Sequence, residues 1–223
     1  MKTASRSLAL PRRQIGKATR DSELGLRNEP RQARARETFE RILAAAAELL
    51  DEVGIDGFNT NLLASRAGVR VRSVYRYFPN KHAVVVTLAK RVVSQWDGWV
   101  SEGLRGITAA DWRVGMGRVI DRYYEGVRSQ PGHSGIRRAM TAVPELHQID
   151  QEDNARIGEL LARALCRISD GPSLPRARLV SRCLVESSVA VIDVALDCSP
   201  AKSKALIDEL KAMHVAYIEA LLE

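Results

Sequence analysis

The side chains best suited to bind a partner are seven basic residues in a stretch that contains no acid. Between Gly57 and Trp96 the sequence has no Asp or Glu. A field of one sign over so short a stretch favours a polyanionic partner, either nucleic acid or an anionic membrane surface. Residues 1–96 hold 18 Lys or Arg against 9 Asp or Glu, whereas residues 97–223 hold 16 against 18, so the excess positive charge lies in the first part of the chain. The seven basic residues are Arg66, Arg70, Arg72, Arg76, Lys81, Lys90 and Arg91.

The motifs of common catalytic sites are missing from the sequence. It has no P-loop, no G-x-S-x-G, no H-E-x-x-H and no G-x-G-x-x-G after a strand. Cys166, Cys183 and Cys198 form no C-x-x-C pair and lack histidines at metal-ligand spacing. We therefore expect a protein that is not an enzyme and has no metal and no cofactor. We expect its cysteines to be reduced core residues.

The basic stretch has the spacing of a helix-turn-helix, with residues 60–81 reading TNLLASRAGVRVRSVYRYFPNK. Two short helices that cross steeply need a small residue at their contact, here Ala64, and a turn that tolerates a left-handed backbone, here Gly68. Asn59 is a suitable N-cap for the first helix, and Pro79 forces a break after the second. The apolar residues that would pin both helices to a third are Leu63, Ala67, Val69, Val74 and Tyr77.

The second helix of such a unit lies in the major groove of DNA, with its N-terminal residues at the base edges. As an isolated charge run its arginines would be a solvated face, but no acid offsets them within this motif. Thr60 and Asn61, at the start of the first helix, are weaker candidates for phosphate contact. Lys81 lies unfavourably against a helix dipole, which a phosphate would compensate; the alternative is a solvated lysine. The side chains that the second helix would present are Arg70, Val71, Arg72, Ser73 and Arg76.

Apolar residues at three- and four-residue steps predict helices along most of the chain and an all-α fold. An amphipathic helix at 34–53 precedes the helix-turn-helix and ends at Gly54. Another helix begins after Asn80, a suitable cap, and continues through Trp96. Glycines and prolines separate further helices, and we find no strand worth defining. These further helices are expected at about 109–129, 134–141, 144–169, 175–197 and 201–222.

No stretch reaches the ~20 uninterrupted apolar residues of a membrane span. The four-residue apolar patch near the N-terminus is too short for a secretory signal. We therefore expect a cytoplasmic protein that is not integral to a membrane. Residues 1–33 show no sustained apolar period and are expected to form a basic disordered arm. Its basic residues could follow the minor groove or the DNA backbone, namely Arg6, Arg12, Arg13, Lys17 and Arg20.

The run AGVRVRSVYRYFPNK, preceded by the helix at 34–53, resembles the N-terminal domain of TetR-family transcriptional regulators. Residues 75–81 are the most specific part, because that family typically ends its recognition helix in Tyr-x-Tyr-Phe and opens the next helix with Lys. The resemblance covers about residues 34–95. It implies that Tyr75 contacts a phosphate, whereas we place Tyr77 in the core. It also implies a dimeric repressor that leaves a palindromic operator when a small molecule enters its second domain.

We accordingly expect the arm at 1–33, a helix-turn-helix DNA-binding domain at 34–80, and a helical ligand-binding and dimerisation domain at 81–223. One departure from the family pattern concerns base reading. Arg70 stands where the family usually has a small N-capping residue, and Arg72 stands where Gly or Lys is common. Losing the cap should cost the helix on the order of 1 kcal/mol. Since Arg can reach the O6 and N7 atoms of guanine, we expect a G-containing operator half-site.

Aromatic and soft side chains gather in the first half of the second domain, and the resemblance implies that they line an apolar ligand cavity. Taken singly, each is better explained by core packing, and the two histidines by surface or hydrogen-bonded positions. The effector would be a small hydrophobic or amphipathic molecule, aromatic or acyl-chained. The candidate ligand-binding residues are Trp96, Trp99, Trp112, Met116, Tyr123, Tyr124, Met140, His133 and His147.

The helices near 175–197 and 201–222 are expected to form the homodimer interface. The apolar arc of the last helix, which includes Leu206, Leu210, Met213, Tyr217 and Leu221, is wider than packing on one side requires. Small residues on its neighbour would let helices approach closely, so two helices per subunit could close a two-fold bundle. The rival hypothesis is a basic helical adaptor that touches nucleic acid or a membrane surface without sequence specificity and senses no ligand.

Overall fold

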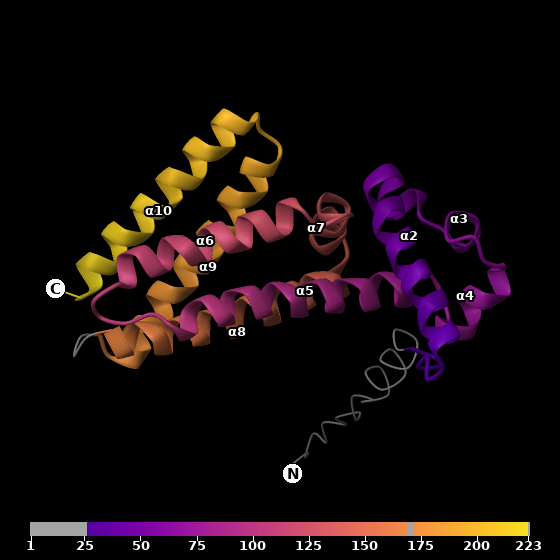
Figure 1. Cartoon of the computed structure of the whole chain (residues 1–223), viewed down its shortest axis with the longest axis horizontal. Helices are drawn as coiled ribbons and strands as arrows, with labels where there is room; N and C mark the ends of the chain where they lie inside the picture. Colours follow the sequence, from indigo (N-terminus) through magenta and orange to yellow (C-terminus); the bar gives the residue numbers. More distant parts are fainter. Residues whose placement is uncertain (1–25, 169–171, 223) are drawn as a thin grey trace, which may run out of the picture.

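The computed structural model describes residues 26–168 and 172–222, and its regular elements within these ranges are nine α-helices. This confirms the predicted all-α fold. A small N-terminal group of helices and a longer bundle are joined by α5 (Figure 1). The arm residues Arg6, Arg12, Arg13, Lys17 and Arg20 lie outside the described residues. The helices are α2 (Ala33–Gly57), α3 (Thr60–Arg66), α4 (Val71–Tyr77), α5 (Lys81–Arg105), α6 (Trp112–Arg128), α7 (His133–Ala142), α8 (Pro144–Ile168), α9 (Leu174–Leu196) and α10 (Pro200–Leu222).

The N-terminal group, α2 to α4, is built by local signals that the sequence displays. Gly54 adopts φ +63° and interrupts α2, which resumes for one turn to Gly57. Asn59 caps α3 because its side-chain oxygen accepts the backbone N–H groups of Asn61 and Leu62 at 3.1 and 3.0 Å. Gly68, also at φ +63°, makes the turn into α4. These devices hold α4 against α2 and α3, with its outer face free.

The long helix α5 connects the N-terminal group α2 to α4, here called the head, to the bundle. The side-chain oxygen of Asn80 accepts the N–H of Ala83 at 2.9 Å and so caps its first turn. At 25 residues the helix is about 37 Å long. Its first half buries Val84 and Leu88 in the core that it shares with α2. Its last turns bury Val100 and Leu104 in a second cluster at the far end of the bundle. One continuous helix therefore contributes to the head, the junction and the bundle.

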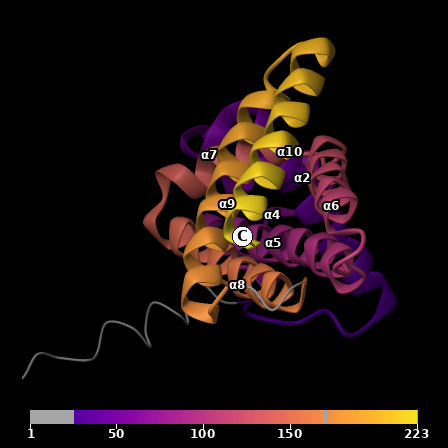
Figure 2. The ribbon, with the colours of Figure 1, turned by 90° about the vertical axis from the view of Figure 1, so that its left-hand side faces the viewer.

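The bundle packs α5 and α6 against α8, α9 and α10. The two last helices run antiparallel along one side of it, as the view along the long axis shows (Figure 2). Its helices begin close to the expected positions, except that the helix expected at about 109 starts at Trp112. The reason is local: the Asp111 carboxylate accepts hydrogen bonds from the backbone N–H and hydroxyl of Thr108, at 2.8 and 2.7 Å, and forms a turn.

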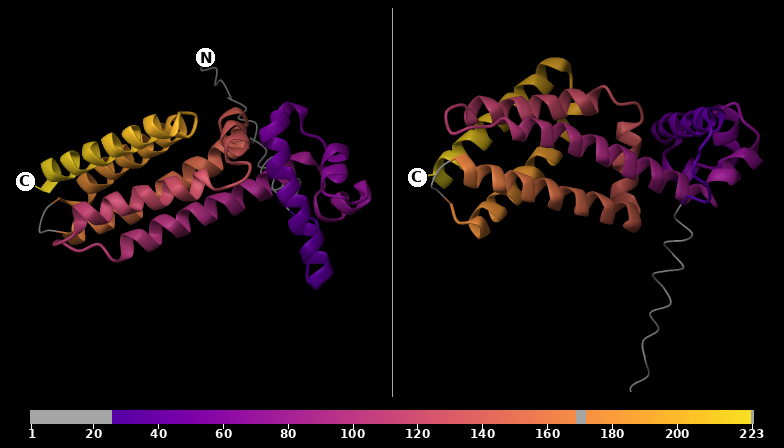
Figure 3. Two further views of the ribbon diagram at one scale, coloured as in Figure 1. Left: turned by 45° about the horizontal axis from the view of Figure 1, so that its top comes forward. Right: turned by 60° about the horizontal axis from the view of Figure 1, so that its bottom comes forward.

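Helix α7 lies across the junction between head and bundle (Figure 3) and packs against α2. Its backbone touches the backbone of α2 at Gly135. A Cβ at this position would lie 2.3 Å from the carbonyl carbon of Leu50 and 2.5 Å from the nitrogen of Asp51. The N–H of Gly135 also donates to the Asp51 carboxylate at 2.5 Å. The head thus packs against α7 through direct contact between the backbones of α2 and α7.

The expectation that all three cysteines are core residues is wrong for Cys183, which is exposed on α9, while Cys166 and Cys198 are partly buried. None of the helices in the described ranges combines the length and the apolarity needed to cross a membrane. Within the same ranges no group of three or more His, Cys, Asp or Glu side chains is arranged to hold a metal ion.

Candidate DNA-binding surface and ligand cavity

Three arginines project from α4 and its N-cap without an acidic partner. Arg70, Arg72 and Arg76 are exposed, and none forms an ion pair with a residue that the structure describes. Arg70 occupies the N-cap position, but its side chain makes no capping hydrogen bond. Its guanidinium is therefore available to a phosphate or a base edge. Arg66 differs, because its guanidinium forms an ion pair with Glu52 of α2 at 2.5 Å.

The two tyrosines of α4 divide as the sequence predicts. Tyr77 is buried, and its hydroxyl donates to the carbonyl of Ala35 at 3.2 Å. Tyr75 is 41% exposed, and its hydroxyl lies 3.2 Å from the hydroxyl of Thr60 at the start of α3. Two residues that the sequence singled out separately for phosphate contact thus form one hydroxyl pair. Asn61, beside them, is exposed as well.

The other candidates on this surface have mixed roles. Val71 and Ser73 are half-buried, and Val71 packs against the core of the head. The Lys81 ammonium donates to the carbonyl oxygens of Phe58 and Ile55 at 3.2 and 3.4 Å. These carbonyls stabilise its charge at the N-terminus of α5, where the sequence pointed to a phosphate or to water. A phosphate contact by Lys81 stays a prediction.

Sequence reasoning missed the residues that brace this surface. Part of the segment assigned to the arm is bound to the end of α4: the N–H of Arg27 donates to the carbonyl of Tyr77 at 2.8 Å, and the amide of Asn28 donates to the carbonyl of Arg76 at 2.8 Å. The guanidinium of Arg41 donates to the carbonyls of Ala67 and Gly68 in the turn. Polar residues without periodicity gave no signal for these contacts.

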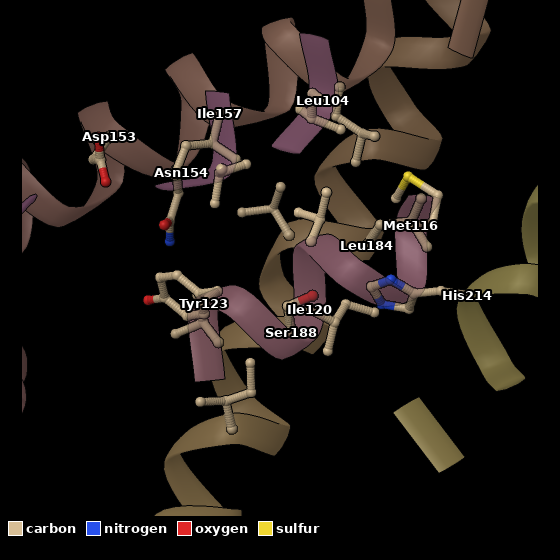
Figure 4. A pocket seen from close by; sticks show the side chains of 16 residues that line it. Leu104, Met116, Ile120, Tyr123, Asp153, Asn154, Ile157, Leu184, Ser188 and His214 are labelled. Carbon is tan, nitrogen blue, oxygen red and sulfur yellow. The ribbon is translucent and has the colours of Figure 1, made fainter. Parts of the chain in front are cut away.

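The bundle contains a partly open cavity of about 60 Å³ among α5, α6, α8, α9 and α10 (Figure 4). Leu, Ile, Val and Met side chains form most of its wall. Figure 4 shows Tyr123 and Asn154 with their polar groups close together, and His214 separated from them by apolar side chains. No Lys or Arg lines this cavity. The polar and charged residues in the wall are Tyr123, Asp153, Asn154, Ser188 and His214.

Burial sets the protonation of these groups. The His214 ring is 2% exposed, and burial lowers its pKa to about 4, so it is neutral at pH 7. Its Nε2 lies 3.1 Å from the hydroxyl of Ser187. Burial raises the pKa of Asp153 to about 7, although the Arg156 guanidinium opposes this shift. Burial also raises the pKa of the Tyr123 hydroxyl. The cavity therefore holds one titrating acid and no fixed cation.

Comparison with known proteins identifies this architecture. The family model described as "Bacterial regulatory proteins, tetR family" matches residues 42–88, and that described as "Tetracyclin repressor-like, C-terminal domain" matches residues 110–222, about half of the chain. The chain belongs to the TetR family. The resemblance inferred from residues 34–95 is confirmed, and this TetR-family chain is a DNA-binding transcriptional regulator with a ligand-binding C-terminal domain.

Individual relatives agree with the family models. A TetR-family regulator from Streptomyces coelicolor is 30% identical, with 85% of this chain and 99% of that chain covered and a TM-score of 0.63. FadR of Bacillus subtilis, in complex with stearoyl-CoA, shares the fold at 19% identity, 83% and 98% coverage and a TM-score of 0.55. Tetracycline repressor class C of Escherichia coli is 31% identical over 122 residues, which is 51% of this chain and 50% of that protein. This match spans half of the curated relative's length, and that to the class A repressor of transposon 1721 from the same organism spans a quarter.

Two of the nine residues expected to bind ligand in this TetR-family protein, Met116 and Tyr123, line the cavity. The other seven lie elsewhere. Trp96 is buried, and its Nε1 donates to the side-chain oxygen of Gln130 at 2.8 Å. Trp112 packs at the far end of the bundle, and Trp99 lies over Gly126 on another face. Tyr124 and Met140 are core residues, His133 is buried beside Trp96 and Asp193, and His147 is exposed.

Helix geometry explains this difference in the TetR-family bundle. Neighbouring residues on a helix point about 100° apart, and here Tyr123 faces the cavity while Tyr124 packs into the core. The sequence-based set also drew on α5, α6, α7 and the start of α8, whereas much of the cavity wall comes from the middle of α8, from α9 and from α10. His214 and Asn154 carried no signal of their own, because a polar residue on an apolar face is usually a satisfied core residue.

Proposed function

We propose that this chain is a ligand-released repressor that binds a palindromic operator as a homodimer. The observation that carries the proposal is the set of exposed arginines at 70, 72 and 76, unpaired within the described structure, on the recognition helix of a TetR-family head. Bidentate contact of Arg with guanine supports a G-containing half-site. Selection of bound sites from random DNA with the purified protein tests this, with a two-fold symmetric sequence as the expected product.

Dimerisation through α9 and α10 is supported by their outer faces. Leu179 and Val194 on α9, and Met213 and Tyr217 on α10, are large apolar side chains exposed in the single subunit. Leu210, from the expected stripe, is instead buried within the subunit. A second copy of these two helices would cover the exposed residues in a four-helix arrangement.

Release by an effector is supported by the size and place of the cavity. Ligand pockets usually measure about 300–1,000 Å³, whereas this cavity measures about 60 Å³. To accommodate a ligand of ordinary size, the side chains or helices that form the wall must therefore move apart. Val100 and Leu104 in the wall belong to α5, the same helix that begins beside the recognition helix. Since a dimer must hold its recognition helices about 34–36 Å apart, a small tilt of α5 would weaken operator binding.

An apolar wall favours a hydrophobic or amphipathic effector, and the stearoyl-CoA bound by the fold relative from Bacillus subtilis supports this class. By linkage, an effector that lowers operator affinity must bind the DNA-bound protein more weakly by the same factor. Operator competition with ligands found by tryptophan fluorescence tests this. A tight ligand of the cavity that leaves operator affinity unchanged at saturation would disprove release.

The rival function, a basic adaptor without sequence specificity, makes a different prediction for DNA binding. Specific regulators bind their sites about 10³–10⁷ times more tightly than random DNA, at equal salt concentration. A ratio near one, measured at several salt concentrations, would favour the adaptor and exclude the repressor.

A further inference from the structure

One end of the cavity gathers polar groups that lack partners. Asn154 is 5% exposed, and its amide makes no hydrogen bond with any residue that the structure describes. The Tyr123 hydroxyl likewise has no such partner within the described ranges. In Figure 4 the Asn154 amide points into the cavity towards the Tyr123 ring. Both residues line the cavity and their polar groups have no partner among the described residues, so they are available to a polar atom of a ligand.

The charge next to this pair is negative. Asp153 lies in the cavity wall and pairs with Arg156, but Arg156 also pairs with Asp97 at 3.3 Å. One guanidinium, half exposed to solvent, thus serves two carboxylates. Ionised Asp153 is only partly neutralised, and burial makes its charge costly.

The neighbouring ion pairs do not supply a positive charge that would neutralise Asp153. Arg137 of α7 is shared in the same way, by Asp150 at 2.5 Å and Asp193 at 3.2 Å. His133 Nε2 lies 3.7 Å from Asp193, and neither residue lines the cavity. At the other end of the cavity the buried His214 ring is neutral. The groups facing the cavity therefore attract a cation and disfavour an anion.

We propose that the cavity binds a hydrophobic amine, whose protonated amino group donates to Asp153, to the side-chain oxygen of Asn154 and to the Tyr123 hydroxyl oxygen. Its apolar body would lie against Met116, Leu184 and Ile120. An ammonium group offers several N–H donors and would satisfy the two unpartnered groups while it neutralises Asp153. A carboxylate or phosphate in the same place would lie against Asp153, with no Lys or Arg in the wall to pair with it. This inference rests on the proposed effector role of the cavity.

Octylamine, octanol and octanoate provide matched probes, because they share a chain length and differ in charge. We expect calorimetry at pH 8 on the full chain to give at least ten-fold tighter binding for octylamine than for octanoate. Asp153→Asn should lower the affinity for octylamine at least ten-fold and leave the affinity for octanol unchanged. Tyr123→Phe, which keeps the ring and removes the hydroxyl, should lower the affinity for octylamine several-fold. Asp56→Asn removes an exposed acid on α2 and should change nothing.

Three results would overturn the inference: octanoate binding as tightly as octylamine, octylamine affinity unchanged in Asp153→Asn, or no octylamine binding at millimolar concentration. Operator affinity in the absence of any probe is measured alongside. If sequence-specific operator binding is absent, the proposed function itself fails. If it is present and the preference for the amine is absent, only the ligand class is wrong. Where octylamine binds, operator affinity should also fall at saturation.

Discussion

At the scale of single residues, we expect DNA recognition to depend on Arg72 and Arg76. Both are exposed and have no ion-pair partner among the described residues, so their removal should not weaken the fold. We expect Arg72→Ala and Arg76→Ala each to weaken specific operator binding by roughly 1–3 kcal/mol, about 5- to 150-fold. Melting temperatures should stay within a degree or two. Gel-shift titration and thermal melting measure the two effects.

Arg105→Ala is the matched control, because Arg105 is an exposed arginine without an ion pair in the described structure, at the far end of α5. It should leave operator affinity unchanged. If both α4 variants bind the operator as tightly as the Arg105 variant, α4 does not read DNA.

Asp153 should make stability depend on pH. Burial raises its pKa from 3.8 to about 7. The folded state therefore binds the Asp153 proton more tightly than the unfolded state does. The resulting contribution to the free energy of unfolding is fully present below about pH 4 and is lost as the pH rises through 7. Asp153→Asn should raise the free energy of unfolding at pH 8 by at most about 4 kcal/mol, and the gain should shrink towards pH 5. Urea titrations at both pH values measure it; an equal difference at the two pH values would contradict the burial effect.

Whether a residue is buried or exposed could be predicted from the sequence where local spacing determines it. Tyr75 and Tyr77 are two positions apart on a short helix, so one faces inwards and the other outwards. The cavity residues could not be predicted in this way. Their exposure depends on how five helices meet, and Asn154 and His214 are apolar-face polar residues whose neighbours come from other helices.

At the scale of elements, the helices were predictable because their ends carry local chemistry. Asn59 and Asn80 cap α3 and α5, and Gly54 and Gly68 take the left-handed conformation at breaks. The docking of α7 on α2 was not predictable, because Gly135 lies inside a helix and nothing near it in sequence indicates a close backbone approach.

Gly135→Ala tests this docking. The added Cβ would collide with the backbone of Leu50 and Asp51. We expect it to lower the free energy of unfolding by roughly 1–3 kcal/mol, the usual range for overpacking. Gly158→Ala in α8 is the control, since its Cβ would meet nothing within 4 Å. The free energy of unfolding of that variant should rise by about 0.5–1 kcal/mol, because Ala has a higher helix propensity than Gly. Equal urea midpoints for the two variants would show that α7 does not hold α2 closely.

At the scale of the whole molecule, the outer faces of α9 and α10 should determine the oligomeric state. We expect a solution mass of about twice 24.7 kDa at micromolar concentration. Met213→Asp and Tyr217→Asp place a charge on the exposed apolar face of α10 and should yield monomers with weaker operator binding. Ala109→Asp, in the exposed turn before α6, should stay dimeric. Light scattering after size exclusion measures the mass, and a monomeric parent protein that binds its operator would refute this interface.

The backbone contact between α7 and α2 also limits how DNA specificity can be exchanged between relatives. A transplanted head brings its own α2 surface to a recipient's α7. If the recipient carries any side chain larger than hydrogen at the place of Gly135, that side chain meets the backbone around Leu50 and Asp51 and shifts the head. Chimeras of this protein are therefore compatible only with partners whose α7 has the same glycine. The head is separable in sequence, but its exchange requires that helix to match.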